Sequence, residues 1–332
     1  MQKRIAVAGA GGMARVRAKA FLATGCATIC GVASRHVETA RALGAEVGCS
    51  DAFADYRRLL ETRPDALLVE VPHAAQDEIV LWGLEHGLHV LIGGASAGSA
   101  ATGRRIAELA SRGRRVVEAG YEQRYSPLWE TAQAMLADGT LGQPVAVRSI
   151  ALWNGDPATW YYSQHASGGM PLTHITYGFL NPIRWLVGDP LCVSAFANRK
   201  RHTAPGLIQE ETCVASLLFA DDVLGSLTAG FVSSPGLPGW SVTLIGTDGA
   251  LELCPAENGI GSLTVYGKSG QPKTLDFPGA RDIFVVQAEA FLATIDGAPA
   301  CRNTPADTLA DLLTVEAIVT SAREHRTVEV GG

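Results

Sequence analysis

A glycine-rich segment near the start of the chain limits the possible fold more than any other feature. Residues 3–8 form a short apolar run, and Gly9-Ala10-Gly11-Gly12-Met13-Ala14 follows it directly, ahead of a helical segment over 13–24. In such a G-x-G-x-x-A pattern the first glycine permits the tight strand-to-helix turn and the second lets the backbone approach a pyrophosphate. The residues expected to bind the phosphates of a dinucleotide are Gly9, Gly11, Gly12 and Met13.

Over residues 1–120, apolar strand-like runs alternate with helical segments. Strands are expected at 3–8, 28–33, 66–71, 89–92 and 115–119, and helices at 13–24, 37–43, 56–62, 76–86 and 101–112. This alternation is typical of parallel strands joined by crossover helices. The pattern predicts an α/β domain of the Rossmann type, a doubly wound parallel sheet, over residues 1–120.

From residue 144 onward the pattern changes, because strand-like runs now follow one another with turns between them. Strands are expected at 145–152, 192–198, 212–219, 223–231, 240–245 and 250–253, and helices at 173–186, 284–295 and 306–323. The pattern predicts an α+β domain with an antiparallel sheet over residues 121–332. Its last helix could pack back on the first domain.

Composition excludes several classes of protein. No apolar run approaches the roughly 18 residues of a membrane span, and residues 1–4 lead straight into a strand without a signal-peptide core. The seven cysteines are an odd number without repeated spacing, which favours reduced thiols in a cytoplasmic protein. Cys26 and Cys30 lie four apart, but no His/Cys pair completes a metal site.

Charge is divided unevenly along the chain. Residues 1–120 carry a net charge of +3 and residues 121–332 carry −9. A mildly positive first half suits an anionic cofactor, and the acidic second half argues against nucleic acid as a partner.

The second expected strand ends without an acidic residue. NAD-preferring sites place a carboxylate there for the ribose hydroxyls, whereas this chain has Ser34 and Arg35. A hydroxyl and a guanidinium suit a 2′-phosphate, so we expect NADP(H) to be favoured over NAD(H). Alternatively, Arg35 stacks on the adenine or points to solvent.

Further short segments follow in order along the chain. They are Val71-Pro72-His73, 87–92 (GLHVLI), 120–127 (GYEQRYSP), 139–144 (GTLGQP), Gly168-Gly169, 184–188 (RWLVG), 245–249 (IGTDG) and the ending around Val315-Glu316-Ala317. With the glycine-rich loop they resemble the Gfo/Idh/MocA oxidoreductase family over nearly the whole chain. The resemblance implies a Rossmann domain, an open-faced C-terminal sheet, NAD(P) between the domains, and homodimers or homotetramers formed through that sheet. It also implies further cofactor-binding residues, namely Val71, Pro72, His73, Gln76, Gly93, Gly94 and Gln123.

The chain departs from the family at its polar positions. The family's Glu-Lys-Pro corresponds to Gly93-Gly94-Ala95, so the usual lysine is missing, and only five of the 27 basic residues are lysines. The family's Asp-x-x-x-His corresponds to His174 and Gly178, a later Asp position is Asn181, and the usual His after Pro72 is Gln76. These replacements change what can carry the proton during hydride transfer.

His174 is the first candidate to replace the missing acid/base, because it lies about one helical turn from the usual histidine. Alternatively it caps a buried helix start. Tyr177 and Tyr161 are further catalytic candidates, although core packing or a hydrophobic lid would also explain them. Candidate substrate-contacting residues are Tyr121, Trp153, Trp160, Tyr162 and His165.

Three functions fit these observations. The first is an NADPH-dependent reductase of a small polar keto or imino substrate, such as a sugar or cyclitol derivative. The second is a glycoside-cleaving or eliminating enzyme that uses a tightly bound nucleotide transiently. The third is a nucleotide-binding protein without catalysis.

Overall fold

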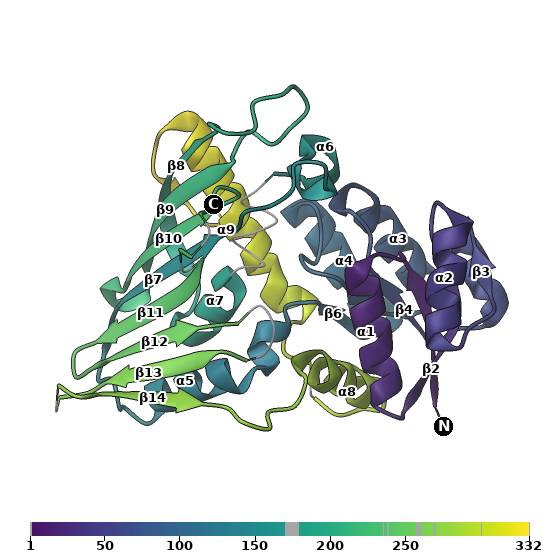
Figure 1. Cartoon of the computed structure of the whole chain (residues 1–332), viewed down its shortest axis with the longest axis horizontal. Coiled ribbons are helices and arrows are strands. Elements are labelled where there is room, and N and C mark those ends of the chain that lie inside the picture. Colours follow the sequence, from purple (N-terminus) through teal and green to yellow (C-terminus); the bar gives the residue numbers. More distant parts are fainter. Residues whose placement is uncertain are drawn as a thin grey trace. The chain divides into compact units, whose positions relative to one another are not determined.

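The structure is a computed structural model that describes residues 2–169, 179–234, 236–237, 239–256, 260–268, 270–299 and 301–331. The chain divides into two units (Figure 1). The first contains Met1–Glu122 and Arg281–Leu309, and the second contains Gln123–Ala280 and Ala310–Gly332.

A six-stranded parallel sheet forms the centre of the first unit, in the order β3-β2-β1-β4-β5-β6. Its strands are β1 (Lys3–Ala8), β2 (Ala27–Ala33), β3 (Ala52–Phe53), β4 (Ala66–Val69), β5 (His89–Ile92) and β6 (Val117–Ala119). Its helices are α1 (Gly12–Ala23), α2 (Val37–Val47), α3 (His73–Glu85), α4 (Ala100–Gly113), α8 (Ile283–Ile295) and a 3₁₀ helix at Tyr56–Thr62. The doubly wound sheet is confirmed. Its order reverses between β1 and β4, where such folds bind nucleotides.

Residues 281–309 fold with the first unit although they lie far along the chain. The ring of Phe291 on α8 meets Phe21 on α1 edge-to-face, with 6.0 Å between ring centroids. Both rings join the core formed by Ile5, Val7 and Leu68. Figure 1 shows α8 beside α1. A single boundary at residue 120 does not describe this arrangement, in which residues 281–309 come back to the first unit. Burial of the apolar face of α8 stabilises it.

A nine-stranded sheet forms the second unit, in the order β14-β13-β12-β11-β7-β10-β9-β8-β15. Its strands are β7 (Pro144–Leu152), β8 (Pro190–Asn198), β9 (Thr212–Phe219), β10 (Leu224–Gly230), β11 (Trp240–Gly246), β12 (Ala250–Cys254), β13 (Ser262–Tyr266), β14 (Pro272–Asp276) and β15 (Val328–Glu329). The described helices that pack with it include α5 (Pro127–Ala137), α6 (Gln164–Ser167), α7 (Asn181–Val187) and α9 (Pro305–Glu324).

This sheet is mostly antiparallel, as expected, but β7 and β10 run parallel. The long connection that follows β7 allows this pairing, which a hairpin would not. The hairpin of β13 and β14 went unpredicted, because β13 is only five residues long and β14 is mostly exposed with one apolar side chain other than its proline. Of the expected helix over 173–186, residues 173–178 lie outside the described residues, and the remainder contains α7.

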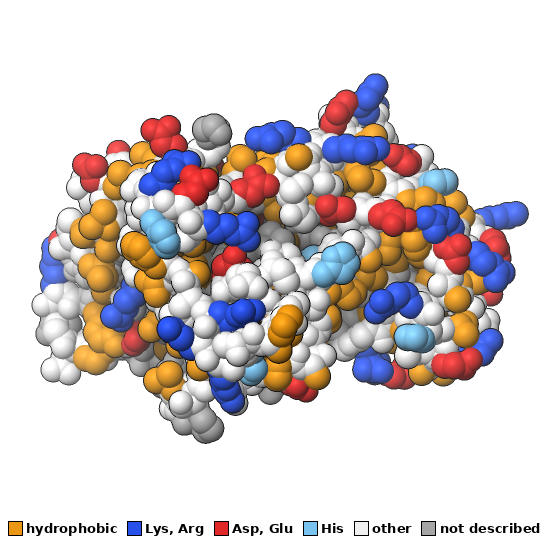
Figure 2. All heavy atoms as spheres, turned by 90° about the horizontal axis from the view of Figure 1, so that it is seen from above, with side chains coloured by type: hydrophobic (Ala, Val, Ile, Leu, Met, Phe, Trp, Pro, Cys, Tyr) orange, Lys and Arg blue, Asp and Glu red, His pale blue; other side chains and the backbone are white. Residues whose placement is uncertain are grey.

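One face of the nine-stranded sheet carries helices α5, α7 and α9, and Figure 1 shows no described helix on the other. Along β9, exposed Val214 alternates with buried Cys213 and Ala215, which assigns it to the uncovered face. Phe196 is its cross-strand partner on β8. Figure 2 shows hydrophobic side chains interspersed with charged ones on the surface of the molecule.

Three further expectations concern the described residues. All seven cysteines are free thiols. Within the described ranges, no group of three or more His, Cys, Asp or Glu side chains could hold a metal ion. The same part of the chain has no helix long and apolar enough to cross a bilayer.

Candidate functional site

The glycine-rich loop joins β1 to α1 at the point where the strand order reverses. Gly9 has a φ of +115°, and a Cβ there would lie 2.7 Å from the carbonyl carbon of Glu70 and closer still to its oxygen. Only glycine fits this position. The next turn is open, because a Cβ at Gly11 or Gly12 would meet nothing within 4 Å.

Helix α1 begins without a side-chain cap and without an acidic residue in its first turn. Its first N–H groups and the positive end of its dipole are therefore suited to an anion. Met13 at this start is 39 % exposed, and Ala14 is buried against the sheet. These features fit the pyrophosphate of a dinucleotide.

Ser34 and Arg35 follow the last residue of β2. The Ser34 hydroxyl accepts a hydrogen bond from the Thr39 hydroxyl at 2.8 Å. Arg35 is exposed. The acidic residue in the first turn of α2, Glu38, forms a surface ion pair with Arg41 at 2.7 Å.

The segment after β4 leads directly into helix α3. Pro72 precedes the first residue of α3, His73, which is 5 % exposed. The Gln76 side chain donates from Nε2 to the carbonyl oxygen of Ala95 at 2.5 Å. This bond ties α3 to the turn after β5, so Gln76 supports the loop that contains Gly93 and Gly94.

A buried charged cluster, absent from the sequence prediction, occupies the carboxyl edge of the sheet. Arg17 on α1 pairs with Glu70 at 2.7 Å and with Glu122 at 3.0 Å. It also donates to the Gln287 side chain at 2.5 Å and to the Gly120 carbonyl at 2.6 Å. We call Arg17, Glu70, Glu122 and Gln287 the Arg17 cluster.

Two carboxylates share one guanidinium in the Arg17 cluster. Burial raises the pKa of Glu70 to about 7, the Arg17 charge opposes that shift, and the Glu122 carboxylate adds to it. The only sequence signal was a glutamate interrupting the apolar run at the end of β4. Gln287, 270 residues from Arg17, gave none.

The aromatic residues of the second unit occupy different environments. Trp160 and Tyr161 stack with ring centroids 4.0 Å apart, and Trp153 meets Trp240 edge-to-face at 5.0 Å. His165 on α6 is exposed. Trp153, Trp160 and Tyr161 are half-buried.

Tyr162 is buried, unlike its neighbours. Its hydroxyl lies 3.0 Å from the Gly155 carbonyl oxygen and 3.2 Å from that of Phe231, both acceptors. Burial raises the pKa of this phenol to about 12. Tyr162 therefore braces its loop, which sets it apart from a residue facing substrate.

Other predicted residues are placed as follows. Tyr121 is 3 % exposed, and its backbone carbonyl accepts a hydrogen bond from the Asn303 side chain at 3.0 Å. Gln123 accepts a hydrogen bond from the Trp129 indole at 3.1 Å. His174 and Tyr177 lie outside the described residues.

Asn181, at a family aspartate position, is part of a buried helix contact. Its amide donates to Asp311 on α9 at 2.8 Å, and Arg184 donates to the same carboxylate at 2.5 Å. Burial raises the pKa of Asp311, and the Arg184 charge opposes that shift. The arrangement holds α7 against α9.

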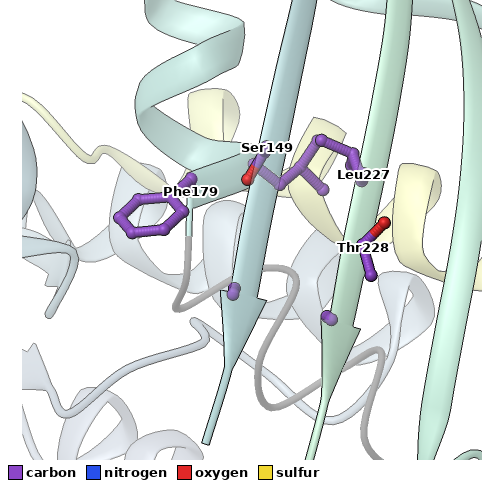
Figure 3. Close-up of a pocket in the computed structure, with 7 residues that line it drawn as sticks. Ser149, Phe179, Leu227 and Thr228 are labelled. Atoms are coloured by element: carbon purple, nitrogen blue, oxygen red, sulfur yellow. The ribbon is translucent and has the colours of Figure 1, made fainter. Parts of the chain in front are cut away.

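A small gap between β7, β10 and the start of α7 is too small for a substrate (Figure 3). Leu227 and Ser149 are direct partners on the two strands, and Phe179 lines the gap beside them. We therefore assign no chemistry to it.

Comparison with known proteins places the chain in a family. Residues 3–121 match the "Oxidoreductase family, NAD-binding Rossmann fold", and residues 129–252 match the "GFO/IDH/MocA C-terminal domain". The chain belongs to the Gfo/Idh/MocA oxidoreductase family. It is an oxidoreductase with an NAD-binding Rossmann domain.

Relatives of this Gfo/Idh/MocA oxidoreductase include two curated bacterial proteins. It is 29 % identical over 154 residues to inositol 2-dehydrogenase 1 of Saccharopolyspora erythraea, a match covering 46 % of this chain and 44 % of that protein. It is 26 % identical over 267 residues to inositol 2-dehydrogenase of Rubrobacter xylanophilus, covering 77 % and 72 %. The first match thus spans less than half of its relative.

A solved structure, levoglucosan dehydrogenase in complex with NADH, shares the fold. Its TM-score is 0.89 with 17 % identity, and the match covers 99 % of both chains. At this identity the likeness shows the fold alone.

Proposed function

We propose that this protein is an NADPH-dependent reductase of a keto or imino group in a small polar substrate, such as a sugar, a cyclitol or a related metabolite. The observation that carries the cofactor preference is the end of β2, where Ser34 and Arg35 stand in place of a carboxylate. The names of the curated relatives, both inositol 2-dehydrogenases, support the substrate class.

The first unit supplies the residues that would hold the nucleotide. Backbone N–H groups at Gly12 and Met13, at the uncapped start of α1, would meet the pyrophosphate. Ser34 and Arg35 would meet the 2′-phosphate. When bound, the nucleotide supplies or accepts the hydride, so the chain itself has to position the substrate and move a proton.

The reductive direction rests on the missing lysine. Oxidation of an alcohol needs a base near the hydroxyl, and Gly94 offers no side chain where the family keeps an amine. A reductase needs only a proton donor, and a protonated imine accepts hydride without one. We propose His174 as that donor, with Tyr161 and Tyr177 as alternatives.

The cofactor preference is tested with Arg35→Ala. Because a charge-assisted hydrogen bond contributes about 1.5–3 kcal/mol, we expect the Kd for NADPH to rise roughly tenfold to a hundredfold while the Kd for NADH stays unchanged. Arg41→Ala, a nearby exposed arginine paired with Glu38, is the matched control. Equal effects on both nucleotides would contradict the proposal.

The direction is tested with the purified protein and a panel of sugars, cyclitols and their keto and imino analogues. NADPH consumption with the analogues is the expected result, and His174→Ala should abolish it. Ready oxidation of the parent alcohols with NADP⁺ and no reduction, or glycoside cleavage without net cofactor turnover, would refute a reductase.

We also propose that two copies associate through the uncovered face of the nine-stranded sheet. Phe196, Val214 and Leu224 on this sheet are 65 %, 46 % and 58 % exposed. Apolar surface of this kind marks protein interfaces. Val214→Arg should produce monomers in light scattering after size-exclusion chromatography, whereas Ser111→Arg on α4 should not.

A further inference from the structure

Gly93 has no side chain, and the space that a side chain there would need is filled by another residue. A Cβ at Gly93 would lie 2.5 Å from Oε1 of Glu70 and closer still to its carboxyl carbon. The carboxylate of Glu70 therefore lies over the first residue after β5, although Glu70 itself follows β4.

The same carboxylate reaches the phosphate-loop helix. Its Oε1 lies 2.7 Å from Nε of Arg17, on the second turn of α1, and the side chains of both residues are at most 10 % exposed. Gly94, which follows Gly93, accepts a hydrogen bond at its carbonyl oxygen from the backbone of Gly120 at 3.2 Å. One buried carboxylate thus links α1 to the turn after β5.

A glutamate side chain at residue 93 would need the space that the Glu70 carboxylate now fills. The carboxyl carbon of a glutamate lies about 2.5 Å from its own Cβ, which is close to the separation between the Glu70 carboxyl carbon and a Cβ at residue 93. Exchanging the carboxylate between residues 70 and 93 measures whether a glutamate at residue 93 can restore the carboxylate beside Arg17.

We propose that Glu70 is a positioning residue of the dinucleotide site, whose carboxylate takes the place of a side chain at residue 93 and holds the Gly93–Gly94 turn against α1. The proposal rests on the proposed nucleotide-dependent function. It assigns Arg17 as the partner that keeps this carboxylate in place, and Gly93 as the residue that leaves room for it.

The test is a carboxylate exchange between the two positions. Glu70→Ala removes the charge and Gly93→Glu adds a second one to a filled space, so each should raise the Kd for NADPH about tenfold or more. Glu70→Ala with Gly93→Glu returns one carboxylate to Arg17, and its Kd and kcat should recover to within about threefold of the original protein. Affinities are measured by calorimetry below every variant's melting temperature.

Two further variants separate positioning from stability. Glu118→Gln alters another buried carboxylate of the first unit, on β6, and should lower the melting temperature while leaving the Kd unchanged. Glu70→Gln keeps the shape of the side chain and replaces Glu70→Ala in the test if the alanine variant does not fold. Its Kd should lie between that of the wild-type protein and that expected for Glu70→Ala.

The outcomes discriminate between the two proposals. If the wild-type protein binds neither NAD(H) nor NADP(H), the proposed function is refuted. If the wild-type protein binds nucleotide and Glu70→Ala or Glu70→Gln binds it equally well, the positioning role of Glu70 is overturned. A folded exchange variant that shows no recovery overturns the replacement of residue 93.

Discussion

Replacing Gly9 by alanine tests the phosphate loop most directly. Gly9 has a φ of +115°, and its Cα faces the backbone of Glu70 at the end of β4. The added methyl group would meet the Glu70 carbonyl well inside van der Waals contact. Either the loop or the end of β4 must move, which disturbs the hydrogen bond from the Glu70 N–H to the Ala8 carbonyl at 2.8 Å.

The magnitude follows from these two effects. A backbone conformation that favours glycine costs about 1–3 kcal/mol for alanine, and forcing an atom into packed surroundings costs about 1–3 kcal/mol more. We expect a loss of about 2–6 kcal/mol in the free energy of unfolding, or at least roughly 4 °C in the melting temperature of a unit of this size. Nucleotide affinity should fall with it, because the loop forms the binding surface.

The matched control is Gly48→Ala at the end of α2. Gly48 also has a positive φ, +73°, but a Cβ there would meet nothing within 4 Å. This variant isolates the conformational cost, about 1–3 kcal/mol. Calorimetric melting and nucleotide titration of both variants complete the assay. If Gly9→Ala melts no lower than Gly48→Ala, the contact with Glu70 is not what requires glycine.

Three other predictions concern buried polar groups. The raised pKa of Glu70, about 7 against 4.5, means that the folded chain keeps a proton that the unfolded chain loses between those values. The free energy of unfolding should therefore fall as pH rises through this window, by at most about 1.4 kcal/mol per pH unit, and urea unfolding of Glu70→Gln should lack this contribution. Asp311→Ala leaves Arg184 and Asn181 without their shared carboxylate and should cost about 3–5 kcal/mol in urea unfolding. Asp189→Ala, which removes an exposed partner of Arg184, should cost at most about 1 kcal/mol. Tyr162→Phe removes the hydroxyl shared by the Gly155 and Phe231 carbonyls and should cost about 1–2 kcal/mol in the same assay, and an unchanged midpoint would show that neither carbonyl depends on it.

Local pattern was sufficient to predict most of the fold. The glycine-rich loop and the alternation of strands and helices predicted the parallel sheet, because each signal depends on residues close together in the chain. The second sheet was predicted in outline, since six of its strands are apolar enough to be read individually. The β13–β14 hairpin was missed because β13 is short and β14 is mostly exposed. The parallel pairing of β7 with β10 was missed because no local signal sets strand direction across a long connection.

The candidate site was predicted only where a motif carries it. Gly9 and the start of α1 follow from the loop, and Ser34 and Arg35 from their place after β2. His174 and Tyr177, proposed from family positions, stay predictions. Nothing in the sequence separates Tyr162 from its aromatic neighbours, yet Tyr162 is buried and its hydroxyl bonds to backbone carbonyls.

The sequence by itself determined that this chain contains a Rossmann domain. The glycine-rich turn, the helix start and the strand spacing that identify it all lie within about 30 residues. Tertiary structure alone decided how the edge of that sheet is charged. Arg17, Glu70, Glu122 and Gln287 come from four separate segments, and their pairing depends on which strand ends lie together and on the return of α8 to the first unit. Because these side chains are largely removed from water, their charges must be paired with one another, and only the folded chain brings the partners together.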